Sequence, residues 1–97
     1  MSNTNIEIAN TILAQLGGNR FLAMTGSKNM IAIENGLQFN LPSRLYFHIV
    51  LNGNDLYNVN MFRLRKLTVF PLRESKDLPV ESLARTFTEW TGMDTRL

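Results

Sequence analysis

The N-terminal segment carries apolar residues at helical spacing. Between Ile6 and Leu16 they recur every three or four residues, and Gly17-Gly18 then offers the left-handed backbone that ends many helices. The pattern predicts a helix over residues 5–16. Polar side chains occupy its other face, so we expect the helix to lie with one side against a sheet.

After this helix the apolar residues form short runs or alternate with polar ones, which is typical of strands. Asn35-Gly36 is the strongest turn signal among them. A turn over residues 25–29 is predicted to join the first two strands as a hairpin. The predicted strands are residues 21–24, 30–33, 37–41, 45–51, 56–62 and 67–72.

Three of these strands have features that suggest their place in the sheet. Residues 45–51 are almost wholly apolar, which favours a central strand covered on both faces. The apolar phase changes between Met61 and Lys66, which predicts a bulge or a turn there. The last strand contains Pro71, which cannot donate to a ladder and therefore favours an edge position or a break.

A second helix is predicted near the C-terminus, opening at residues 77–79 and ending at Gly92. Helices at the two ends and strands between them indicate an α+β fold formed by a single domain, residues 1–97. We expect an antiparallel meander sheet of about five to six strands, flanked by an N-terminal and a C-terminal helix packed on one face. The opposite sheet face is then the expected binding surface.

Catalytic chemistry finds little support in the composition. The 97 residues include no cysteine and one histidine, which excludes disulfides, thiolate metal sites and a cysteine nucleophile. His48 has no acidic neighbour in sequence, so we interpret it as a strand histidine with a backbone or water partner. We predict no catalytic residue, no metal ligands and no cofactor, and therefore a protein that is not an enzyme.

Targeting signals are equally sparse. No apolar run approaches the length of a membrane span, and the polar N-terminus does not have the pattern of a signal peptide. The expectation is a cytoplasmic protein without a membrane partner.

Basic residues cluster in one part of the chain, although the net charge is only +2. Cations next to aromatic strands suit nucleic acid, because the cations neutralise phosphates and an exposed ring stacks on a base. Arg20 and Arg44 are candidates to join the cluster, and Tyr46, Phe47, Tyr57 and Phe62 lie in nearby strands. The predicted nucleic-acid-binding residues are Lys28, Arg63, Arg65, Lys66 and Arg73.

Other interpretations of the same residues stay open. The aromatic side chains can belong to the core, with the arginines a solvated strand edge that discourages aggregation. Lys28 lies in the Gly-containing segment 25–29, which is either a plain turn or a phosphate contact through its backbone N–H groups. An exposed edge or an apolar patch would instead favour a protein-interaction module, such as an inhibitor of a host enzyme or defence complex, or a homodimer.

Residues 12–21 (ILAQLGGNRF) and 24–29 (MTGSKN) resemble a family of small phage and prophage-encoded proteins, and residues 87–92 (FTEWTG) fit the same pattern. The resemblance implies an accessory protein of a virus or mobile element that acts in the bacterial cytoplasm. It carries over no catalytic or binding residue to this chain.

Overall fold

Two helices precede the sheet. The computed structural model describes residues 4–92, apart from the side chains of residues 4, 24 and 43. Helix α1 spans Thr4–Leu16 and helix α2 spans Asn19–Thr25. The predicted helix over residues 5–16 is confirmed, whereas the strand predicted over residues 21–24 is wrong, because these residues lie in α2.

Helix α2 forms where a four-residue apolar run predicted a strand. Such a short run shows neither the helical nor the strand period, so it does not distinguish the two structures. The helix brings Phe21 and Thr25, four residues apart, into the interior, and it leaves Ala23 exposed. The Thr25 hydroxyl donates to the Phe21 carbonyl at 2.7 Å. Gly26 (φ 70°) ends the helix, so the segment predicted as a hairpin turn is a helix-to-strand connection.

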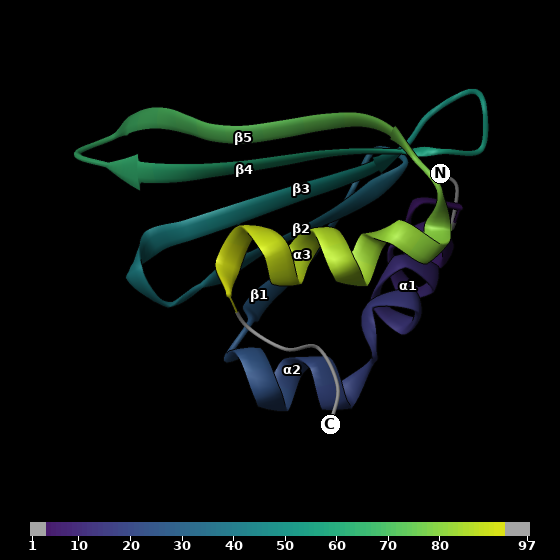
Figure 1. The fold of residues 1–97 in the computed structure, drawn as a ribbon, viewed down its shortest axis with the longest axis horizontal. Coiled ribbons are helices and arrows are strands. Elements are labelled where there is room, and N and C mark those ends of the chain that lie inside the picture. The colour runs from purple at the N-terminus through teal and green to yellow at the C-terminus, as the bar shows by residue number, and fades with distance from the viewer. Residues whose placement is uncertain (1–3, 93–97) are drawn as a thin grey trace.

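Five antiparallel strands follow, and their order in the sheet is their order in the chain (Figure 1). The meander predicted from the sequence is confirmed. Short turns connect neighbouring strands, as in a series of hairpins. The strands are β1 (Lys28–Ile33), β2 (Gly36–Leu41), β3 (Leu45–Leu51), β4 (Tyr57–Arg65) and β5 (Thr68–Leu78).

Strand β3 lies in the middle of the sheet, but only one of its faces is covered. Phe47 and Ile49 are buried, whereas Tyr46 and His48, which alternate with them along the strand, are half-buried on the other face. The prediction of a strand covered on both faces is therefore wrong. Its apolar character comes from side chains such as Tyr46, which partly covers its neighbours on a face that no helix covers.

The apolar phase change near residue 62 has a different cause from the predicted bulge. Strand β4 runs without interruption from Tyr57 to Arg65, and the irregularity lies in β5, where Leu72 is an extra residue between the pairs Met61–Arg73 and Phe62–Pro71. Met61 is buried under the helices, whereas Arg63 on the same face is exposed. Coverage by the helices thus ends between these two residues.

Strand β5 is the edge strand that Pro71 predicted, and it is longer than expected. It continues to Leu78, so the C-terminal helix begins later than the sequence suggested. A single 3₁₀ turn, η2 (Val80–Ser82), leads into α3 (Leu83–Thr91), and Gly92 ends that helix with a left-handed backbone.

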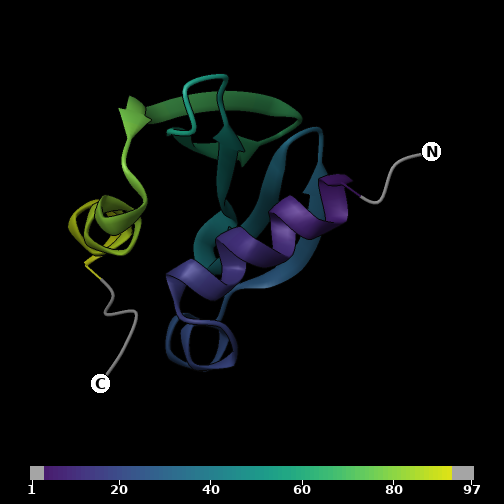
Figure 2. The same cartoon turned by 90° about the vertical axis from the view of Figure 1, so that its right-hand side faces the viewer.

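Helices α1 and α3 pack on the same face of the sheet, which curls around them (Figure 2). Four phenylalanines join the layers, and ring centroids lie 5.5 Å apart for Phe21 and Phe39 and 5.1 Å apart for Phe47 and Phe87. The helices leave the second face of the sheet uncovered.

Candidate nucleic-acid interface

One end of the sheet gathers cations from three separate segments. The start of β1, the connection between β2 and β3, and the turn between β4 and β5 all lie at this end, because neighbouring strands are antiparallel. We name it the basic end. Residues 26–30, 40–46 and 62–71, which form it, contain no aspartate or glutamate. The cations of the basic end are Lys28, Arg44, Arg63, Arg65 and Lys66.

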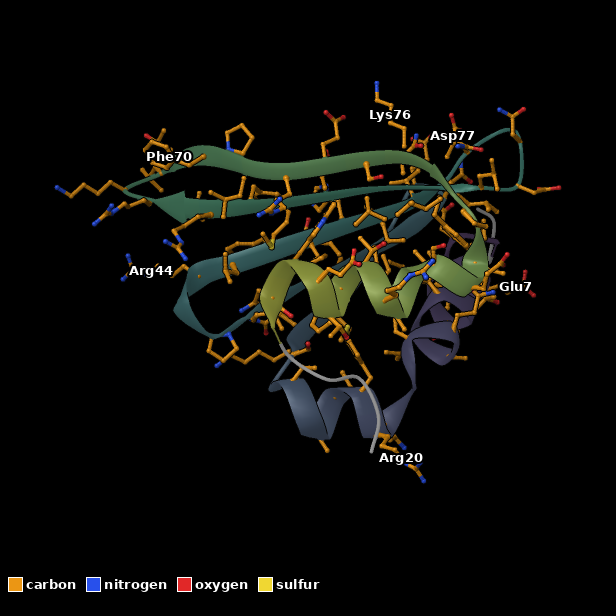
Figure 3. All side chains as sticks on the ribbon, in the orientation of Figure 1. Glu7, Arg20, Arg44, Phe70, Lys76 and Asp77 are labelled. Carbon is orange, nitrogen blue, oxygen red and sulfur yellow. The ribbon has the colours of Figure 1, made fainter. Side chains whose placement is uncertain are left out.

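The opposite end of the sheet carries negative charge. Its connections hold Glu34 and Asp55, and Asp77 lies at the end of β5 beside the cation Lys76 (Figure 3). Arg44 and Asp77 are accordingly far apart along the strands (Figure 3). The two ends of the described sheet therefore carry opposite charges, although the net charge of the chain is only +2. Such a separation orients an anionic partner toward the basic end.

Three arginines of the basic end surround a surface hollow. Arg44 comes from the short 3₁₀ turn η1 (Pro42–Arg44), and Arg63 and Arg65 come from the same face of β4. Together with Leu64 they line a hollow of about 400 Å³, which we name the arginine hollow. Guanidinium groups bind phosphate oxygens through two parallel hydrogen bonds, so this hollow suits a phosphate group. Among residues 4–92, no carboxylate forms an ion pair with these arginines.

The structure brings four of the five predicted residues to the basic end, with Lys28 apart from the other three. Arg63, Arg65 and Lys66 are close in sequence, whereas Lys28 lies on β1, three strand spacings or about 14 Å from β4. Arg73 does not belong to this group, because it lies in the middle of β5 as the partner of Met61.

The two additional candidates differ in their positions. Arg44 completes the arginine hollow. Arg20 lies in α2, away from the basic end (Figure 3).

Of the predicted aromatic side chains, half belong to the core. Phe47 and Tyr57 are buried. Tyr46 and Phe62 are register partners on the uncovered face, with stacked rings whose centroids lie 5.4 Å apart. Phe70, which was not among the predicted aromatic residues, is 46% exposed and is the register partner of Arg63. Its place near Pro71 on an edge strand was the available signal for exposure.

His48 lies beside this aromatic pair on the uncovered face. Its Nε2 atom is 2.6 Å from Oε1 of Gln38, and its ring meets Phe62 edge to face at 5.0 Å. A backbone or water partner was predicted, but the partner is a side chain of the neighbouring strand. Burial lowers the pKa of His48 from its ordinary value of 6.5, so the ring is neutral near pH 7 and Nε2 donates to Gln38.

We expect an NMR titration of the imidazole of His48 to have a midpoint below 6.5. The chain has one histidine, so the signal needs no assignment. The unfolded chain takes up this proton near pH 6.5, whereas the folded chain resists it. Above pH 6.5, neutral His48 therefore makes its full contribution to the free energy of unfolding. This contribution is lost as the pH falls from 6.5 toward the pKa of His48 in the folded protein. The urea-unfolded chain is the control, and an equal or higher midpoint in the folded protein would contradict the burial of the ring.

A second hollow, of about 390 Å³, lies on the uncovered face beside the bulge of β5. His48, Asn60 and Phe62 line one side, and β5 residues that include Arg73 and Glu74 line the other. Because a cation and a carboxylate lie together here, this hollow is less suited to a phosphate than the arginine hollow.

Neither a metal centre nor a membrane span is found in the part of the chain that the structure describes. No group of three or more histidine, cysteine, aspartate or glutamate side chains within residues 4–92 could hold a metal ion. No helix in that range is long and apolar enough to cross a bilayer.

Comparisons with known proteins add no relatives. The chain matches no protein-family model, and neither a curated protein nor a solved structure matches it.

Proposed function

We propose that this protein binds nucleic acid through its basic end, without catalysing a reaction. The observation that carries the proposal is the gathering of five cations, free of neighbouring carboxylates in sequence, at one end of the sheet. Phosphates are the anions that such a group binds, and release of their counterions supplies the affinity. The arginine hollow gives one phosphate a defined position.

The biological setting is part of the same proposal. The resemblance of residues 12–21 and 24–29 to small phage and prophage-encoded proteins favours an accessory protein that acts in the cytoplasm of a bacterial host. Exposed Phe70 beside Arg63 adds a ring for stacking next to a cation for phosphate.

Reversing three charges of the basic end should abolish this binding. The variant Arg63→Glu/Arg65→Glu/Lys66→Glu is expected to bind labelled duplex DNA, single-stranded DNA or RNA at least about a hundredfold more weakly at low salt. The slope of log K against log salt concentration should become shallower by about 3, because up to three phosphate contacts are lost. Fluorescence anisotropy at several salt concentrations measures both quantities.

A matched control separates the basic end from net charge. Arg20→Glu/Lys76→Glu/Arg85→Glu changes the net charge equally through three exposed cations that lie elsewhere. We expect this variant to keep most of the affinity. Equal losses in the two triple variants would refute a localised site, and no binding by the wild-type protein at low salt would refute the function itself.

A protein-interaction module is the second candidate, favoured by the exposed edge of β5. This edge strand presents Val69, Phe70 and Leu72, each about half exposed, beside unpaired backbone groups. As an inhibitor of a host enzyme or defence complex, the protein would pair this edge with a strand of its target. A second copy of the chain would pair with the edge in the same way. This candidate would be favoured if the wild-type protein bound a host protein but no nucleic acid, and if the variant Phe70→Asp no longer bound that host protein.

A further inference from the structure

The turn between β4 and β5 has a backbone that its residues do not favour. Arg65 and Thr68 form the last pair of the hairpin, which leaves Lys66 and Leu67 as a two-residue turn. Their φ angles are +50° and +67°. Turns with two such residues strongly prefer Asn-Gly, because the Cβ atom of other residues crowds the following carbonyl oxygen in this conformation.

Unfavourable left-handed residues gather at the basic end. Seven residues other than glycine have positive φ angles among residues 4–92 of the chain, and four of them are asparagine or aspartate, which tolerate this conformation. The remaining three are Arg44, Lys66 and Leu67. Strain of this kind is typical of functional sites.

The side chain of Leu67 has no role in the fold. It is 96% exposed, so it gains nothing from the core, and an asparagine would hold the same turn with less strain. The turn also projects past the neighbouring strand, because β3 starts only at Leu45, the partner of Arg63, whereas β4 continues beyond Arg63 to Arg65 (Figure 1). The hairpin therefore holds an apolar side chain out into solvent.

The charges around the tip identify the chemistry of its partner. Arg65 and Lys66 directly precede Leu67 in sequence, and Arg65 lines the arginine hollow together with Arg63 and Arg44. A partner that fits both features has negative charge outside and apolar stacked surfaces within reach. Duplex nucleic acid has this arrangement, and minor-groove proteins commonly insert an apolar side chain between neighbouring base pairs.

We propose that Leu67 is a wedge that enters a base step of duplex nucleic acid while Arg65 and Lys66 neutralise the adjacent phosphates. This inference rests on the proposed function, and it adds the class of nucleic acid and the mode of contact. The left-handed turn serves to present the side chain at the outermost point of the hairpin.

Leu67→Asn tests the wedge while leaving every charge in place. Asparagine tolerates the left-handed backbone, so the melting temperature should be unchanged or raised. We expect duplex affinity to fall about tenfold, the scale of one lost base contact, while the salt dependence stays the same. A duplex with 2-aminopurine at a flexible TA step should become brighter on binding the wild-type protein, because the base unstacks, and should not do so with the variant.

Two further variants show whether a loss of affinity comes from the missing Leu67 side chain, from asparagine itself or from removing any exposed apolar residue. Leu67→Gly removes the same side chain and should behave as Leu67→Asn does. Val80→Asn makes the same kind of change at an exposed apolar residue of η2, away from the basic end, and should bind as the wild-type protein does.

The outcomes separate the wedge from the basic end. Wild-type binding without a 2-aminopurine signal, equal duplex affinity in Leu67→Asn, or a wild-type protein that binds single strands alone would each overturn the wedge and leave the proposed function standing. Failure of the wild-type protein to bind any nucleic acid would overturn both.

Discussion

Phe87→Ala is expected to lower the free energy of unfolding by about 3–5 kcal/mol. The side chain is 1% exposed, and its ring lies 4.9 Å from that of Phe21 and 5.1 Å from that of Phe47. It therefore joins α3 to both α2 and the sheet, and truncation leaves a cavity that rigid neighbours on three elements cannot fill. For a domain of this size the loss is a large part of the total, about 5–15 kcal/mol.

Urea unfolding followed by the fluorescence of Trp90 measures this loss. The chain has one tryptophan, and it packs against Phe47 with centroids 6.1 Å apart, so its emission reports on the same core. Phe70→Ala is the matched control, because Phe70 is exposed and should lose less than about 1 kcal/mol. Similar losses in the two variants would contradict the packing described for α3.

Gly36→Ala should destabilise the protein by about 3 kcal/mol through a steric clash. A Cβ atom at this position would lie 2.2 Å from the carbonyl oxygen of Ile49 and 3.0 Å from Cα of Val50. Both atoms belong to the backbone of β3, so they can move only if β2 and β3 separate. That separation would weaken the bond from the Leu51 amide to the Asn35 carbonyl, which is 2.8 Å long.

Gly53→Ala is the control for the effect of alanine itself. Gly53 lies in the connection between β3 and β4, and no atom lies within 4 Å of a Cβ built there. We expect its thermal unfolding to match that of the wild-type protein, or to shift slightly upward because alanine restricts the unfolded chain. If Gly36→Ala melted at the same temperature as Gly53→Ala, the close approach of β2 and β3 at this point would be refuted.

The Asn35-Gly36 signal predicted a hairpin correctly, but the glycine is needed for a different reason from the one the signal implies. Asn35-Gly36 correctly predicted a hairpin, since Ile33 and Gly36 pair across the turn. However, Asn35 carries the left-handed backbone (φ 57°), while Gly36 already belongs to β2. The glycine is required by its distance from β3, a contact between strands that the local sequence does not contain.

The candidate site was only partly predictable for the same reason. Arg63, Arg65 and Lys66 are neighbours in the chain, so their clustering could be seen directly. Arg44 joins them only because the meander brings the start of β3 beside the end of β4. Arg73 is close to the cluster in sequence but lies apart from it in the middle of β5.

Local pattern alone determined the elements whose hydrophobic period was long enough to be distinctive: the first helix, the alternating strands and the edge position of the strand with Pro71. Tertiary structure decided what local pattern leaves undefined. The apolar run that begins at Phe21 became a helix because its ring is buried against Phe39 and Phe87. Likewise, Met61 is buried and Leu67 is exposed because the helices cover one region of one sheet face, and that coverage depends on residues far away in the chain.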